Sequence, residues 1–107
     1  MQRQLIRVPI IAGTEPRLRA WIQGLDKRRD ALGQVLQAEG LEVEVVALDR
    51  SGAGAALLIY TSGPDLAASS AAFANSQHPV DVEFKQLMGE CLALDQARVV
   101  EVLLSWP

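Results

Sequence analysis

The chain has 107 residues, of which half are hydrophobic, so it can form one apolar core without disulfides or metals. Thirteen acidic residues against ten Lys and Arg leave a net charge of -3, which argues against nucleic acid as a partner. The single cysteine, Cys91, cannot form an internal disulfide, and no apolar run is long enough for a signal peptide or a membrane span. We therefore expect a single cytoplasmic domain over residues 1–107 that has no membrane partner.

The first half of the chain changes its apolar period twice. Residues 3–10 are short, apolar and partly alternating, which predicts a strand. Thr14 is a potential N-cap, and apolar residues then recur at the spacing of one helical face until Gly40, a potential C-cap. Residues 41–48 alternate with period two and are rich in valine. We therefore expect a strand, one long helix and a second strand.

The second half of the chain is expected to contain a hairpin arm, a helical region and a last strand. Residues 49–54 are rich in glycine and predict a hairpin turn, with its second arm at 56–61. Helices are expected to about residue 74 and again over 80–91, and a last strand over 97–106. The order strand, helix, strand, strand, helix, strand predicts an α+β, ferredoxin-like βαββαβ fold: a four-stranded antiparallel sheet with its helices on one face.

The sheet face turned away from the helices is expected to be unusually apolar. Strand alternation assigns to it the apolar residues Leu5, Val46, Leu48, Leu58, Val99 and Leu103, and the polar residues Arg7, Glu44, Tyr60 and Glu101. An apolar patch of this extent indicates an interface or a ligand cleft. We therefore expect a homodimer in which two sheets enclose a largely dry chamber.

Several short motifs resemble, in order and spacing, an uncharacterised bacterial family of unknown function within the dimeric α/β-barrel superfamily. The resemblance spans residues 4 to about 91 and is carried by Leu5-Ile6-Arg7-Val8, Glu15 through Trp21, Glu39-Gly40, Val43-Glu44-Val45, Tyr60, Ser76-Gln77-His78-Pro79-Val80-Asp81, Lys85 and Cys91. It implies a dimeric α/β barrel. Because the superfamily includes cofactor-independent monooxygenases, polyketide cyclases, lactone isomerases and haem-binding enzymes, it implies a pocket more firmly than a reaction. This chain has Phe84 where that narrower family tends to carry a second histidine, which argues against an activity that needs a histidine pair.

Four residues are candidates for acid/base chemistry. His78 is the only histidine and lies in the break between two helical segments, where it could act as a general acid or base. Glu44 could move a proton if it is desolvated, and Tyr60 and Arg7 could stabilise an oxyanion. Two structural interpretations stay open: His78 as an exposed or capping residue, and Arg7, Glu44 and Glu101 as ion pairs at a dimer interface.

The same reasoning yields a ligand site and a function. Leu5, Val46, Leu58, Phe84 and Glu101 are expected to line the ligand cleft. One histidine with scattered carboxylates predicts no metal site, and no cofactor is expected, with haem on His78 as the remaining option. We expect a small homodimeric protein that binds an apolar, oxygenated small molecule, as a cofactor-independent cyclase, isomerase or monooxygenase. The alternative is a non-catalytic dimeric ligand-binding or interaction protein.

Overall fold

The computed structural model describes residues 1–106, and its strands and helices follow the expected order. The elements are β1 (Gln2–Pro9), α1 (Glu15–Gly24), the 3-10 helix η1 (Leu25–Arg28), α2 (Arg29–Glu39), β2 (Val43–Asp49), β3 (Ala56–Gly63), α3 (Leu66–Asn75), α4 (Pro79–Cys91), the 3-10 helix η2 (Leu94–Gln96) and β4 (Arg98–Val100). The strands form one antiparallel sheet in the order β2-β3-β1-β4. This is the predicted α+β, ferredoxin-like topology.

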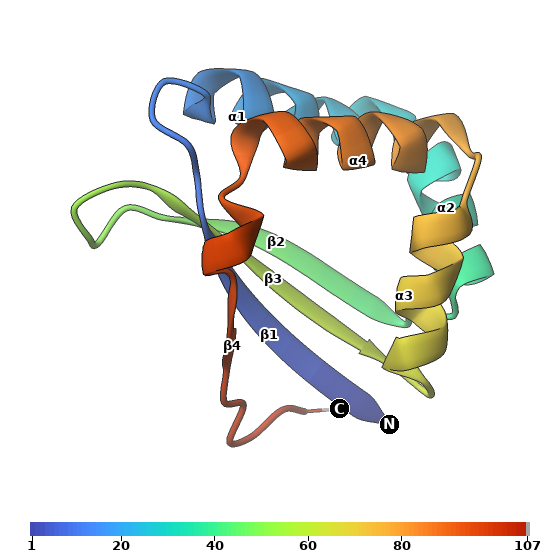
Figure 1. The fold of residues 1–107 in the computed structure, drawn as a ribbon. Helices are drawn as coiled ribbons and strands as arrows, with labels where there is room; N and C mark the ends of the chain where they lie inside the picture. Colours follow the sequence, from blue (N-terminus) through green and yellow to red (C-terminus); the bar gives the residue numbers. More distant parts are fainter. Residues whose placement is uncertain (107) are drawn as a thin grey trace.

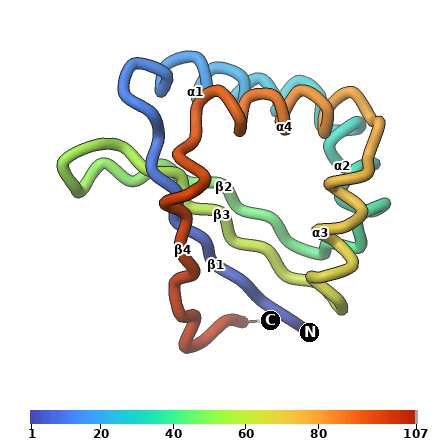
Figure 2. The backbone as a smooth tube through the Cα atoms, in the orientation of Figure 1, coloured from blue at the N-terminus to red at the C-terminus, as the bar shows by residue number. Residues whose placement is uncertain are grey.

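The helices cover one face of the sheet and leave the other without a helix (Figure 1). The tube view follows the same path, with α1 and α4 above the strands and α3 rising beyond one end of the sheet (Figure 2). The buried core lies between the helices and the sheet, and its members are Val8, Leu18, Leu57, Cys91 and Leu92. Burial of these side chains fixes the helical layer on this one face.

The expected long helix is interrupted in the middle. Residues Leu25–Arg28 form a 3-10 turn between α1 and α2, and Arg28 leaves helical geometry at φ -126° and ψ 34°. The sequence from Asp26 to Asp30 carries five consecutive charged residues, so no apolar side chain there holds the helix on the sheet. Arg28 instead binds Glu83 of α4 with two hydrogen bonds of 2.8 and 3.1 Å. The turn bends the helical layer at this point.

The last strand is much shorter than expected. β4 covers only Arg98–Val100, whereas the sequence pattern predicted a strand over 97–106. The chain beyond it turns under the sheet, where the hydroxyl of Ser105 lies 2.8 Å from that of Tyr60. Leu103 and Leu104, which the prediction placed in this strand, are more than four-fifths exposed. Valine and leucine alone therefore did not make a strand: the pairing ends at Leu5 and Val100, although β1 itself continues to Gln2.

The predicted faces of β2 and β4 are wrong, whereas those of β1 and β3 are right. The register pairs Glu44 with Thr61 and Val46 with Ile59, which turns Glu44, Val46 and Leu48 toward the helices. In β4, Val99 lies opposite Ile6 and therefore also faces the helical side. Because paired residues share a face, a single register decides the orientation of a whole strand.

Candidate functional site

A cavity of about 190 Å³ lies between the helical layer and the sheet. Most of its wall is apolar, with Ile6, Val46 and Ile59 from the sheet and Leu32, Leu36 and Met88 from the helices. Polar side chains enter from several elements: Gln4, Glu39, Glu44, Thr61, Ser69, Ser70 and Asp81. An apolar cavity with a few convergent polar groups is the usual composition of a small-molecule site.

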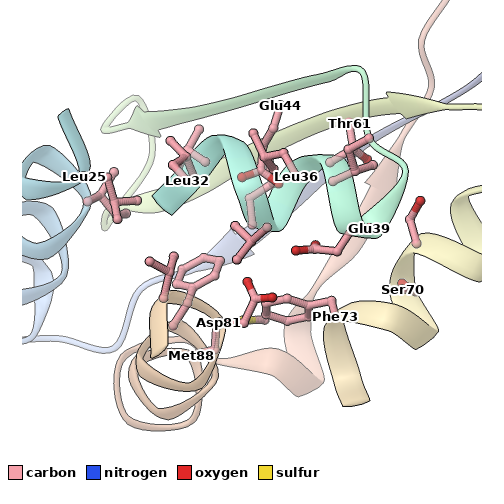
Figure 3. A pocket seen from close by; sticks show the side chains of 18 of the residues that line it. Leu25, Leu32, Leu36, Glu39, Glu44, Thr61, Ser70, Phe73, Asp81 and Met88 are labelled. Atoms are coloured by element: carbon pink, nitrogen blue, oxygen red, sulfur yellow. The ribbon is translucent and has the colours of Figure 1, made fainter. Parts of the chain in front are cut away.

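Three carboxyl groups from three different elements meet in this cavity. Glu39 is the last residue of α2, Glu44 lies on β2, and Asp81 lies in the first turn of α4. Figure 3 shows the carboxyl groups of Glu39 and Asp81 turned toward one another, and the two share a hydrogen bond. Asp81 is only 4% exposed. The cavity therefore brings together one buried carboxyl, that of Asp81, and two part-exposed ones, those of Glu39 and Glu44.

The environment favours the protonated form of two of these carboxyls. Burial, the charge of Asp81, the hydrogen bond with Asp81 and the charge of Glu44 raise the pKa of Glu39 to about 8, against a small opposing effect of Lys85. Burial and the charge of Asp81 also raise the pKa of Glu44. A carboxyl that keeps its proton near neutral pH can act as a general acid. The cavity therefore holds a carboxyl that keeps its proton near neutral pH, next to a second carboxyl.

Two glycines place Glu39 at the cavity. Gly40 ends α2 in the left-handed conformation with φ 74°, as the sequence predicted for a C-cap. At the end of β3, a Cβ atom on Gly63 would lie 2.6 Å from the backbone oxygen of Gly40. The end of α2 can approach β3 this closely only because Gly63 lacks a side chain. This contact sets the depth at which the carboxyl of Glu39 enters the cavity.

Aromatic rings close another side of the cavity. Trp21 stacks on Phe84 with ring centroids 5.4 Å apart, and Phe73 packs edge-on to Phe84 at 6.1 Å. The indole nitrogen of Trp21 donates a 2.9 Å hydrogen bond to Glu83, which also binds Arg28. These hydrogen bonds, with that from Arg28 the stronger, lower the pKa of Glu83 to about 2. Glu83 therefore stays charged and anchors the aromatic wall.

His78 does not line this cavity. It is the N-cap of α4, where its Nδ1 accepts a 3.2 Å hydrogen bond from the backbone nitrogen of Val80. This is the capping role that the sequence left open. The acid or base role of His78 stays a prediction. The side chain that enters the cavity from this end of α4 is that of Asp81, three residues further along.

The remaining predicted site residues are divided between the two faces of the sheet. Glu44, Val46 and Phe84 line the cavity beneath the helices, whereas Leu5, Arg7, Leu58 and Tyr60 lie on the opposite face. The prediction that Glu44 shares a chamber with Tyr60 and Arg7 is therefore wrong, because the register of β2 turns Glu44 the other way.

The predicted ion pairs of Arg7 also differ from those observed. Arg7 binds Asp49 at 3.3 Å, and neither Glu44 nor Glu101 forms an ion pair among residues 1–106. Glu101 follows β4 and is exposed at the edge of the sheet. Within the described chain Arg7 therefore pairs with Asp49, and an interface held by Arg7 with Glu44 or Glu101 stays a prediction.

The sequence prediction missed Glu39 and Asp81 as site residues, although both interrupt a buried apolar stripe. Leu32, Leu36 and Glu39 follow the three-and-four spacing of one face of α2. Asp81 stands on the same face of α4 as Phe84 and Met88, and all three line the cavity. A carboxylate in a helical stripe that is otherwise apolar was the available signal.

The three carboxyls are not arranged as a metal site. Among residues 1–106, no group of three or more His, Cys, Asp and Glu side chains has the arrangement to hold a metal ion. No Lys, Arg or His side chain lines the cavity, and none of the three carboxyls belongs to an ion pair among these residues. The arrangement is therefore suited to exchanging protons with a neutral or cationic ligand.

Comparison with known proteins places the chain in a family. A model described as a family of unknown function (DUF6176) matches residues 1–106. The chain belongs to this family. A search of curated proteins found no match. The predicted membership of an uncharacterised family is therefore confirmed.

Two solved structures share the fold. An L-rhamnose mutarotase, FA22100 from Formosa agariphila, superposes with a TM-score of 0.63 at 12% identity and covers 100% of both chains. PA3566 from Pseudomonas aeruginosa superposes with a TM-score of 0.58 at 13% identity, over 97% of this chain and 93% of its own. These matches confirm the predicted ferredoxin-like α+β fold. Within residues 1–106, every helix is too short or too polar to cross a bilayer.

Proposed function

We propose that this protein is a cofactor-independent acid/base catalyst that interconverts the anomers of a free sugar in the cavity beneath its helices. The observation that carries the proposal is the hydrogen-bonded carboxyl pair of Glu39 and Asp81 in a cavity whose walls are mostly apolar. The volume of about 190 Å³ is below the roughly 300 Å³ at which sites for drug-sized ligands begin, and is suited to one sugar ring.

The reaction needs one proton donor and one proton acceptor at the same time. Asp81 takes the proton from the anomeric hydroxyl while Glu39, which keeps its proton near neutral pH, gives its own to the ring oxygen. The bond between the anomeric carbon and the ring oxygen breaks, and the open-chain aldehyde forms. After rotation the same steps run in reverse, so protons and electrons balance without a cofactor.

The structural neighbours support this choice among the cyclase, isomerase and monooxygenase reactions that the sequence left open. One neighbour of the same fold is described as an L-rhamnose mutarotase. Anomer exchange requires only the acid and base that this cavity contains. A monooxygenase or a cyclase would need further groups to handle oxygen or to fold a long chain.

The test is the rate of anomer exchange, measured by magnetisation-transfer NMR on L-rhamnose and a panel of aldohexoses. We expect an enhancement over buffer for at least one sugar, and a loss of about 10²- to 10⁴-fold in Glu39→Gln and in Asp81→Asn. Glu42→Gln, a change at an exposed carboxyl just before β2, is the matched control and should keep the full rate. Unchanged rates in both cavity variants, or no enhancement for any sugar, would refute the proposal.

We also propose that the protein is a homodimer joined through the sheet face without helices, here called the open face. Its centre is a row of apolar side chains across all four strands, formed by Val45, Tyr60, Leu5 and Val100. Val45 is 51% exposed. A second copy placed sheet to sheet would remove this row from water, as in other closed symmetric dimers.

The oligomeric state tests this second proposal. Sedimentation equilibrium should give about twice the chain mass of 11.6 kDa for the natural protein and the monomer mass for Val45→Glu. Val82→Glu, a change at a 43% exposed valine on α4, is the control and should leave the dimer intact. A monomeric natural protein would contradict the proposal.

A further inference from the structure

The end of the chain carries the most exposed large apolar side chains of residues 1–106. Leu103 is 87% exposed, Leu104 86% and Trp106 94%. They belong to residues 102–106, here called the C-terminal segment, in which no residue is charged. Apolar side chains that are exposed singly are ordinary, whereas a continuous exposed apolar patch usually marks a contact with another molecule.

The C-terminal segment is not paired with the sheet of its own copy. The ladder between β4 and β1 ends at Leu5 and Val100, although β1 continues to Gln2. A groove separates the start of β1 from the departing chain, and its walls are Met1, Arg3, Gln4, Val99, Val100, Glu101 and Val102. The segment therefore adds no strand to the sheet, and its three large side chains contribute little to the core of its own copy.

The segment lies on the same side of the sheet as the open face. The hydroxyl of Ser105 is 2.8 Å from that of Tyr60, which stands in the central row of this face. Figure 1 shows the chain beyond β4 running beneath the sheet, opposite the helices. A second copy placed on the open face would therefore meet the C-terminal segment as well as the strands.

The area that a stable dimer needs also favours the segment as part of the interface. A specific interface buries about 800 Å² of each partner. Of the central row, Leu5, Tyr60 and Val100 are already part-buried in the single chain. One tryptophan side chain can bury on the order of 200 Å². A dimer that used the strands alone would leave its largest apolar side chains in water.

We propose that in the homodimer the C-terminal segment of each copy packs on the open face of the other copy, with Trp106 as its main anchor. This inference rests on the homodimer proposed above and names the segment that completes its interface. Two-fold symmetry makes the contact reciprocal, so each dimer contains it twice. Tryptophan is enriched among the residues that dominate interface energies, and charged residues are depleted at interface cores.

The first test measures the exposure of Trp106 in solution. The chain contains two tryptophans, Trp21 and Trp106, so Trp21→Phe leaves Trp106 as the single tryptophan emitter. Acrylamide should quench this emission several-fold less in the dimer than in the monomer formed on dilution, because the side chain is 94% exposed in the single chain. Val45→Glu in the same background supplies a monomer as the reference. In the natural protein the accessible share of the emission should fall in the same way.

The second test measures the contribution of Trp106 to the dimer. Sedimentation equilibrium should show that Trp106→Ala raises the dimer dissociation constant about tenfold or more. Trp106→Phe keeps an aromatic anchor and should have a smaller effect. Val82→Ala, on α4 and away from the open face, is the control and should leave the dissociation constant unchanged.

The outcomes separate this inference from the proposed homodimer. If Val45→Glu dissociates the dimer but Trp106 is quenched equally in dimer and monomer, or if Trp106→Ala leaves the dissociation constant unchanged, the inference is wrong and the homodimer stands. If Trp106 is shielded in a chain that stays monomeric, the segment covers its own copy and both proposals are wrong. A monomeric protein with an accessible Trp106 would also overturn both. Quenching of the natural protein needs no substitution, so a variant that fails to fold does not block the test.

Discussion

Substituting Glu39 by glutamine should make the protein more stable at alkaline pH and leave it nearly unchanged at pH 5. Glu39 has a pKa of about 8 in the folded chain, against an ordinary value of 4.5. The folded state therefore binds this proton more tightly than the unfolded state does. Stability is retained below the unfolded pKa and is lost as the pH rises from about 4.5 through about 8.

The size of the effect follows from the shift. At about 1.4 kcal/mol per pKa unit, the full shift corresponds to a ceiling of about 5 kcal/mol. Glu39 is only partly buried, so water screens its charge, and we expect about 2 kcal/mol at pH 9. Glutamine has the same shape and no charge, so it avoids this loss while still hydrogen-bonding to Asp81.

Urea unfolding at pH 5, 7 and 9 measures the effect as the difference in unfolding free energy between Glu39→Gln and the natural protein. The difference should grow with pH, since charge on Glu39 is repelled by Asp81 and Glu44. Glu42→Gln removes an exposed carboxyl and should give a difference near zero throughout. A flat difference for Glu39→Gln between pH 5 and pH 9 would show that the cavity does not hold a proton on this residue.

Three further changes test how the fold supports the site. Gly63→Ala should lower the free energy of unfolding in urea by about 1–3 kcal/mol, because its Cβ would lie 2.6 Å from the backbone oxygen of Gly40. Gly33→Ala, in α2 with open space around it, is the control and should raise the free energy of unfolding by up to about 1 kcal/mol. Equal effects of the two changes would contradict the close approach of Gly63 to Gly40. His78→Ala should lose about 1 kcal/mol of stability through the lost cap while His78→Ser should not, and anomer exchange should persist in both. Glu83→Gln should destabilise by about 1 kcal/mol at most at low salt, and the loss should shrink in 1 M NaCl if the ion pair with Arg28 carries it.

Local sequence patterns predicted most of the fold but only part of the candidate site. The order of the elements follows directly from three local signals: Gly40 at the end of α2, Pro79 at the start of α4, and the change of the apolar period from 3.6 to two. Phe84 and Val46 line a cavity, but beneath the helices and not on the sheet face where the ligand cleft was expected, so their ligand role stays a prediction. Glu39 and Asp81 each interrupt an apolar stripe of their own helix, but only the packing of α2 against α4 brings the two carboxyls together.

The face of β2 shows why local patterns could not complete the prediction. One of its alternating sets, Val43, Val45 and Ala47, is entirely apolar, whereas the other contains Glu44, so alternation alone assigns the first set to the core. The structure instead exposes that set on the open face and buries the set with Glu44. The cavity makes room for the carboxyl of Glu44. Because elements far apart in the sequence build this cavity, a local pattern carries no information about it.

The amino-acid sequence by itself determined the order and type of the elements, because hydrogen bonding and side-chain period act between residues close along the chain. Only the tertiary structure decided three further features: the pairing register of β2 with β3, the close approach of Gly40 to Gly63, and the meeting of Glu39, Glu44 and Asp81. Each of these depends on how separate elements pack. Packing partly buries Glu39 and Glu44 and brings them close to Asp81, and this loss of hydration together with the charge of Asp81 raises the pKa of both.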